Sequence, residues 1–176
     1  MHPARRRLLW INVFGGVAVL GSYWYGFATT RDPGALWGGV PDWMRPAYAV
    51  SMLAAAAGYF PAFAFVLLRL DAERVRVGRQ GYGVFSALYA LMLVPSALWM
   101  PLTFRMLEAP SEGLWIVIRF VLCAVAVGSV GLLVAIVRAH PRPSTAIFRL
   151  AVAGQLAFCV QTAVLDPLVW PAYFPH

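Results

Sequence analysis

Two ionisable side chains, Arg119 and Asp166, lie deep inside long apolar stretches of this chain. An unpaired charge in a membrane is costly, so such residues usually face the interior of a helix bundle and find a partner there. Each lies about 9 Å from the same end of its stretch, at about 1.5 Å of helical rise per residue. We expect an ion pair that fixes the last two helices; the functional alternative is a ligand anchor or a proton-coupled site.

Polar residues recur with helical spacing along the last apolar stretch. Gln155, Cys159, Thr162 and Asp166 follow the i, i+4, i+7, i+11 pattern of one helix face. This stripe should face protein or a cavity. Small residues in the preceding stretch predict close packing of helices: Gly128, Ser129 and Gly131.

Five apolar stretches must position these side chains. A helix that spans the hydrocarbon layer needs about 20 mostly apolar residues, and five stretches reach that length: Leu8 to Thr29, Pro46 to Leu68, Tyr82 to Phe104, Gly113 to Val137 and Ala146 to Ala172. The composition agrees, with 61% hydrophobic residues, 12% charged residues and a mean hydropathy of +0.73. The sequence predicts an all-α integral membrane bundle of five helices in a single domain, residues 1–176.

The arginines between these stretches alternate between dense and sparse clusters. Three connections are rich in arginine: Arg5, Arg6 and Arg7; Arg69, Arg74, Arg76 and Arg79; Arg138, Arg142 and Arg149. The others hold Arg31 and Arg45, or Arg105 alone. The positive-inside rule then predicts the N-terminus inside and the C-terminus outside, in a bacterial inner membrane. Although the net charge is +7, basic residues at helix ends do not indicate a nucleic-acid partner.

Side chains that would support a metal or catalytic centre do not converge in the sequence. The three histidines, His2, His140 and His176, lie outside the apolar stretches, so buried haem ligation is not expected. The chain has no lysine, which excludes covalent lysine chemistry. No enzyme motif appears in a suitable context, and nothing in the sequence demands an enzyme or a fixed cofactor.

The aromatic residues gather toward the predicted outer side. Only Trp10 maps to the inner side. The other six tryptophans map to the outer side: Trp24, Trp37, Trp43, Trp99, Trp115 and Trp170. They form either an interfacial aromatic belt or an aromatic pocket that opens outward with the first loop as its lid. Pro95 and Pro101 bracket Ser96 and Trp99, which predicts an irregular outer half of the third helix, as a ligand wall or as a bend.

Three short motifs resemble the tryptophan-rich sensory proteins, the bacterial relatives of the translocator protein. The segment SALWMPLTF, residues 96–104, is similar to the family's pattern in its third helix, through Leu98, Trp99, Pro101 and Phe104. The segment PDWMRP, residues 41–46, resembles the start of its second helix. In the last helix, Leu165, Asp166 and Trp170 resemble the family's Leu-Asn followed by an aromatic, with Asp in place of Asn.

This resemblance implies an outward, helix-enclosed pocket for a planar hydrophobic ligand, such as a tetrapyrrole or a sterol-like lipid, in a protein that forms homodimers. It places Trp43, Tyr48, Trp99 and Asp166 in the wall of the pocket. With the polar and aromatic residues above, the predicted ligand-binding set is Trp43, Tyr48, Ser96, Trp99, Arg119, Gln155, Thr162, Asp166 and Trp170.

Two other functions remain open on the sequence alone. A short chain without a soluble domain also fits a non-catalytic structural or assembly subunit of a larger membrane complex, in which the aromatic and small-residue faces would contact other chains. An intramembrane enzyme would need at least one more polar catalytic group near Asp166.

Overall fold

The computed structural model describes residues 1–30, 32–143 and 146–174, so Arg31 and His176 lie outside the described residues. Helices form most of the described chain. They are α1 (Pro3–Thr29), the short 3₁₀ helix η1 (Pro33–Trp37), α2 (Arg45–Ala64), η2 (Phe65–Arg69), α3 (Gly83–Glu108), α4 (Glu112–Arg138), α5 (Ala146–Cys159), η3 (Val160–Val169) and α6 (Trp170–Tyr173). Here η2 and η3 are π-helical continuations of α2 and α5.

Five helical segments in the described residues are long and apolar enough to cross a membrane. They are Pro3–Thr29, Arg45–Arg69, Gly83–Glu108, Glu112–Arg138 and Ala146–Tyr173. The predicted all-α fold with five helices of spanning length and hydropathy is therefore confirmed, with boundaries that differ by a few residues.

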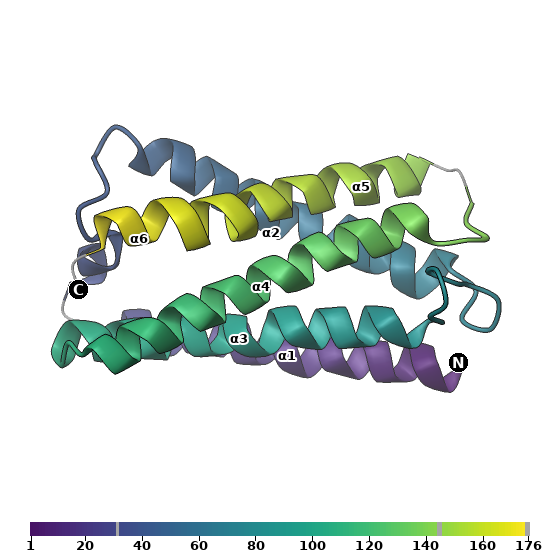
Figure 1. Ribbon diagram of the computed structural model, residues 1–176, viewed down its shortest axis with the longest axis horizontal. Helices are drawn as coiled ribbons and strands as arrows, with labels where there is room; N and C mark the ends of the chain where they lie inside the picture. Colours follow the sequence, from purple (N-terminus) through teal and green to yellow (C-terminus); the bar gives the residue numbers. More distant parts are fainter. Residues whose placement is uncertain (31, 144–145, 175–176) are drawn as a thin grey trace.

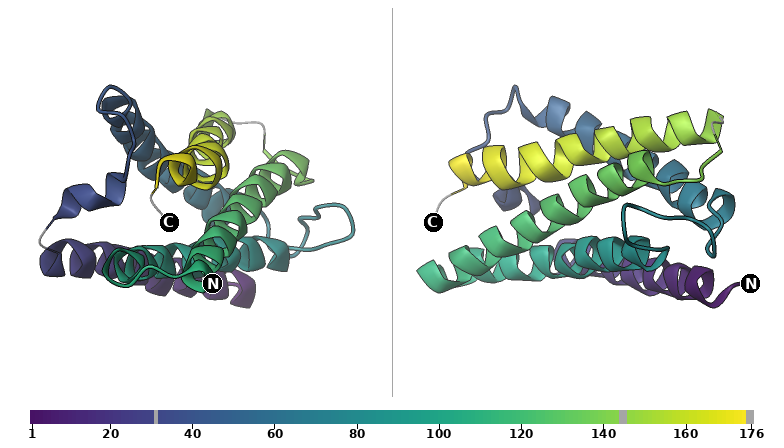
Figure 2. Two further views of the ribbon diagram at one scale, coloured as in Figure 1. Left: turned by 60° about the vertical axis from the view of Figure 1, so that its left-hand side comes forward. Right: turned by 45° about the vertical axis from the view of Figure 1, so that its right-hand side comes forward.

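The helices pack in an order that differs from their order in the chain. One layer holds α1 and α3, the other holds α2 and α5, and α4 crosses diagonally between the layers, where it packs on α3, α5 and η3 (Figures 1 and 2). Two groups of buried side chains fill the interior. One surrounds Phe65, Phe85 and Tyr89 near the N-terminus, and the other surrounds Tyr48 and Trp170 at the opposite end.

Small residues let the helices of each layer approach closely. Gly58 of α2 touches the backbone of Gly154 in α5, since a Cβ atom at Gly58 would lie 2.6 Å from the Cα atom of Gly154. A Cβ atom added at Gly128 of α4 would likewise lie 3.2 Å from the Met92 Cβ atom of α3. Contacts of this kind are typical of helix pairs in membranes, where close van der Waals packing replaces the hydrophobic effect.

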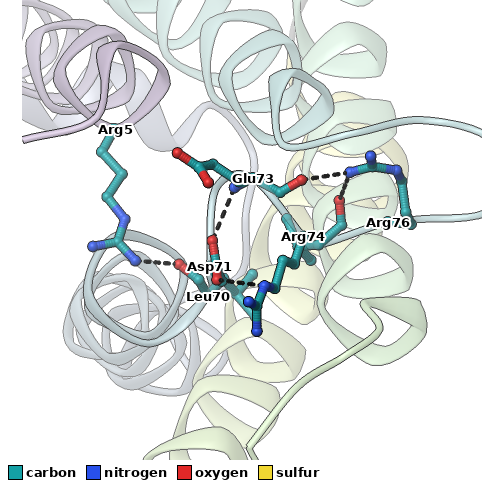
Figure 3. A network of polar contacts seen from close by, with 7 residues as sticks. Arg5, Leu70, Asp71, Glu73, Arg74 and Arg76 are labelled. Carbon is teal, nitrogen blue, oxygen red and sulfur yellow. Dashed lines mark hydrogen bonds and ion pairs between the residues drawn. The ribbon is translucent and has the colours of Figure 1, made fainter.

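The end of the bundle that holds the N-terminus carries most of the arginines, and we call it the basic end. Here the Arg5 Nη2 atom of α1 donates a hydrogen bond of 2.5 Å to the carbonyl oxygen of Leu70, just after η2 (Figure 3). One to two turns further along α1, the Tyr59 hydroxyl of α2 donates to the Asn12 Oδ1 atom. These two contacts connect the first helix with the second.

The loops of the basic end are ordered by their own polar contacts. The Asp71 Oδ1 atom accepts a hydrogen bond of 2.9 Å from the Glu73 N–H, and this bond holds the pKa of the Asp71 carboxyl below its ordinary value (Figure 3). Arg76 and His140 exchange backbone hydrogen bonds of 2.8 and 2.9 Å, so the loop after η2 is paired with the loop after α4.

The third helix keeps its α-helical type through its two prolines, so the irregularity predicted for its outer half is not a change of helix type. α3 continues through Pro95 and Pro101 as α-helix from Gly83 to Glu108. The irregular turns lie instead in η2 and in η3, which contains Pro167. Each of these prolines removes one N–H from the helical ladder, yet Pro167 lies in a π-helical segment whereas Pro95 and Pro101 lie in an α-helix.

We predict that Gly58→Ala lowers the stability of the bundle by about 1 to 3 kcal/mol, because the added methyl group overlaps the Gly154 backbone, which cannot move aside as a flexible side chain can. Thermal unfolding in detergent measures this change. Gly16→Ala is the matched control, since a Cβ atom at Gly16 meets nothing within 4 Å. Equal melting temperatures for the two variants would contradict the close α2–α5 contact.

Candidate functional site

An aromatic cluster occupies the end of the bundle opposite the basic end. We define this cluster as Tyr23, Trp37, Tyr48, Trp99, Trp115, Trp170 and Phe174. Trp170 is buried at its centre, with ring centroids 5.7 Å from Trp99, 6.1 Å from Trp115 and 4.4 Å from Phe174. Edge-to-face and tilted pairs at these separations are favourable ring geometries.

The first loop covers this aromatic cluster. The Trp170 Nε1–H donates a hydrogen bond of 2.8 Å to the carbonyl oxygen of Leu36 in η1. The Gly39 N–H donates one of 2.7 Å to the carbonyl oxygen of Tyr173, and the Trp37 ring stands edge-on to Tyr48, at 5.8 Å and 85°. The loop is thus fixed to the last and second helices by both backbone and side-chain contacts.

The tryptophans at this end divide into two groups. Trp24 and Trp43 expose 78% and 79% of their surface, as expected for residues of an interfacial belt. Trp37, Trp99, Trp115 and Trp170 pack into the core around Tyr48 instead. The structure therefore places Trp43 outside the cluster, although the sequence predicted it in the wall of a pocket.

The π-helical turn η3 determines where the Asp166 side chain points. Its Oδ1 atom accepts a hydrogen bond of 2.6 Å from the Gln161 Nε2 atom, five residues earlier. Residues five apart lie on different faces of an α-helix, whereas the i to i+5 hydrogen-bond pattern of a π-helix brings them closer together. Gln161 was missing from the sequence-based set because α-helical spacing does not connect it with Asp166.

The predicted Arg119–Asp166 ion pair is absent from the ion pairs of the described residues. Asp166 is bonded to Gln161 instead. Arg119 is half-buried and lies one helical turn after Trp115 of the aromatic cluster, on the same side of α4. The prediction placed both residues at one level and could not foresee that the π-helical turn pairs Asp166 with Gln161.

Two tyrosine hydroxyl groups, one from α1 and one from α2, lie near Asp166. The carboxylate is within electrostatic range of the Tyr23 hydroxyl of α1 and the Tyr48 hydroxyl of α2. Tyr48 itself donates a hydrogen bond of 2.6 Å to the carbonyl oxygen of Leu165, the residue before Asp166. The Tyr23 ring also packs against Trp99 of α3 in a tilted arrangement, with ring centroids 6.1 Å apart. We call Tyr23, Tyr48, Trp99, Gln161 and Asp166 the Asp166 site.

Two buried polar atoms of the Asp166 site have no hydrogen-bond partner within the described residues: the Trp99 indole Nε1–H and the Gln161 Oε1 atom. Buried polar atoms in native proteins nearly always have a partner. The Trp99 N–H is a hydrogen-bond donor, and the Gln161 Oε1 atom and the Asp166 carboxylate are acceptors. The site can therefore both donate hydrogen bonds to a polar molecule and accept them from it.

Gln155 and Thr162 form a separate polar cluster nearer the middle of the bundle. The Gln155 Nε2 atom donates a hydrogen bond of 3.0 Å to the carbonyl oxygen of Ser129, and the Thr162 hydroxyl lies 2.8 Å from the Ser129 Oγ atom. Both side chains are buried, as the predicted stripe requires. These bonds fix α5 and η3 to α4 through their shared partner, Ser129. The sequence had predicted only a packing role for Ser129.

Ser96, the remaining predicted site residue, bonds within its own helix. Its hydroxyl donates a hydrogen bond of 2.7 Å to the carbonyl oxygen of Met92, one turn earlier in α3. Among the described residues, no three His, Cys, Asp or Glu side chains lie together in a way that could hold a metal ion. Of the predicted set, Tyr48, Trp99, Asp166 and Trp170 meet, whereas Trp43 is exposed and Ser96, Gln155 and Thr162 make their hydrogen bonds elsewhere. Arg119 forms no ion pair with Asp166 in the described residues.

Comparison of the chain with protein-family models, with curated proteins and with solved structures finds no match.

We predict that Tyr48→Phe lowers the free energy of unfolding by about 1 kcal/mol, because it removes the hydrogen bond that connects α2 with the Leu165 carbonyl. Chemical unfolding in detergent measures the loss. Tyr25→Phe is the control, since Tyr25 is exposed and its hydroxyl has no hydrogen bond in the described part of the chain. If both variants unfold alike, the Tyr48 bond does not stabilise this end.

Proposed function

We propose that this protein binds a small hydrophobic ligand at the Asp166 site, between α1, α2, α3 and η3. The observation that carries the proposal is the carboxylate of Asp166, which lies inside a spanning segment, has Gln161 as its hydrogen-bond partner and forms no ion pair among the described residues. An ionisable group at this depth is expensive and usually functional.

The surroundings of Asp166 define the chemistry of the ligand. Aromatic rings offer flat apolar surfaces, and the few polar groups among them orient the bound molecule, which is the usual composition of a ligand site. A carboxylate accepts hydrogen bonds, so the ligand must present an N–H or O–H group to it. The N–H groups of a porphyrin and the hydroxyl of a sterol both meet this requirement.

The resemblance to the tryptophan-rich sensory proteins supports the same class of ligand. The motif residues Trp99, Asp166 and Trp170 come from α3, η3 and α6, and the Trp99 and Trp170 rings lie 5.7 Å apart beside the Asp166 site. Rings contact one another across this region, so a bound ligand takes the place of some ring–ring contacts. In this proposal the protein senses or carries its ligand in a bacterial inner membrane, as a homodimer.

We predict that protoporphyrin quenches the tryptophan fluorescence of the purified protein, and that Asp166→Asn weakens this binding about fivefold. A hydrogen bond to a charged group contributes about 1 kcal/mol more than one to a neutral group, which corresponds to that factor. Titration of fluorescence against porphyrin concentration gives both dissociation constants.

Asp42→Asn is the matched control for this titration, because Asp42 is an acidic residue near the same end of the bundle but its side chain is 90% exposed. Its affinity should equal that of the unchanged protein. The alternative function, a structural or assembly subunit, predicts that the chain co-purifies only with other membrane proteins and that porphyrin leaves its fluorescence unchanged; that result would overturn the proposal.

The proposal also places the aromatic end outside the cell and the basic end inside, from the distribution of arginine. In a chain with Cys123→Ala and Cys159→Ala, we expect a membrane-impermeant maleimide to label Asp42→Cys in intact cells. It should label Glu73→Cys only after the cells are permeabilised, because Glu73 lies in the loop of the basic end. The reverse labelling pattern would invert the orientation.

A further inference from the structure

A shallow groove of about 390 Å³ runs between α1 and α3 in the half of the bundle next to the basic end. Small side chains shape its floor. Gly15 of α1 lies so close to α3 that a Cβ atom there would be 2.8 Å from the Leu93 Cδ1 atom, and Ala90 lines the groove beside Leu93. Larger residues at Gly15 and Ala90 would fill the space.

Aromatic rings form one wall of this groove. Trp10 and Phe14 lie one turn apart on α1 and stack with ring centroids at 5.3 Å and an interplanar angle of 24°. Both rings also lie open at the surface of the bundle, with 50% and 66% of their area exposed. Trp10 is the only tryptophan of the chain in this half, so the groove has its own spectroscopic reporter.

Arg7 is the charged residue of the groove, at the end that reaches the membrane surface. It is exposed and takes part in none of the ion pairs of the described residues. The remaining lining is apolar apart from the indole of Trp10. The groove therefore combines a long apolar channel with one unpaired cation at its mouth.

The length of the groove matches one leaflet of a bilayer. Arg7 and Gly15 are eight residues apart, which corresponds to about 12 Å along a helix. The hydrocarbon layer is about 30 Å thick, so one leaflet provides about 15 Å. A chain that lies in the groove with its polar group at Arg7 thus stays within the leaflet on the basic side.

The surrounding charge selects an anionic headgroup. Ten of the fourteen arginines lie at the basic end, against two acidic residues there, Asp71 and Glu73. Anionic lipids are attracted to such surfaces by about 1 kcal/mol per arginine. A second copy of this chain on the same face would bring its own Arg6 and Arg7 toward these arginines, because copies in one membrane share their orientation; like charges then oppose that packing.

We propose that the α1–α3 groove is a binding site for an anionic phospholipid, with one acyl chain along Trp10 and Phe14 and the phosphate paired with Arg7. This site is independent of the Asp166 site and of any ligand bound there.

Quenching of Trp10 by brominated lipids tests this site. The full-length protein is reconstituted in bilayers that contain equal fractions of phosphatidylglycerol or phosphatidylcholine with a dibrominated acyl chain. The contribution of Trp10 is the difference between the protein and its Trp10→Phe variant. We expect phosphatidylglycerol to quench Trp10 more strongly, and Arg7→Gln to reduce this preference about fivefold, the effect of one arginine.

Two further variants separate the groove from the general basic surface. Arg6→Gln removes an adjacent exposed arginine that does not line the groove and should keep the preference. Ala90→Phe fills the groove and should abolish it, whereas Leu91→Phe, next to it but outside the lining, should not. Equal quenching by both lipids would overturn the proposal, as would equal losses in Arg6→Gln and Arg7→Gln. Shielding of Trp10 from both lipids in a cross-linked dimer would overturn it as well and would assign the groove to a second copy.

Discussion

The hydrocarbon layer offers no water, so each polar group that enters it needs a partner inside the bundle. This requirement explains where the helices touch. The Asn12–Tyr59 bond connects α1 with α2, and the bonds of Ser129 connect α4 with α5 and η3. Between these points the contacts are close packing of small residues, such as Gly58 against Gly154. Polar bonds and glycine contacts thus determine the relative positions of helices whose apolar surfaces alone specify little.

The same requirement gives the Asp166 site its special character. Elsewhere in the described bundle most buried polar side chains bond to a neighbouring helix or to a carbonyl one turn away, as Thr162 and Ser96 do. At the Asp166 site the carboxylate is bonded to Gln161 within the π-helical segment, and the Trp99 indole N–H remains without a partner in the described residues. π-Helical turns are frequent at functional sites, because they place side chains where a regular helix cannot.

The sequence predicted the spanning helices well and their contacts poorly. Length and hydropathy are local properties, so the five spans and the buried stripe of Gln155 and Thr162 followed from them. The predicted Arg119–Asp166 pair failed because Asp166 is bonded to Gln161 within the π-helical turn. The role of Gln161 depends on a π-helical turn, and the Gly58–Gly154 contact depends on the pairing of α2 with α5. Neither feature can be read from the spacing of residues in the sequence.

The two ends of the bundle hold α1 and α2 together in different ways. At the basic end, Arg5 donates to the Leu70 carbonyl, and the Asn12–Tyr59 bond follows deeper in the membrane. At the aromatic end, Tyr23 of α1 and Tyr48 of α2 are both within electrostatic range of the Asp166 carboxylate, and Tyr48 is bonded to η3 rather than to α1. Under the proposed function, a ligand that enters between α1 and α2 beside Asp166 would break neither the Arg5–Leu70 bond nor the Asn12–Tyr59 bond.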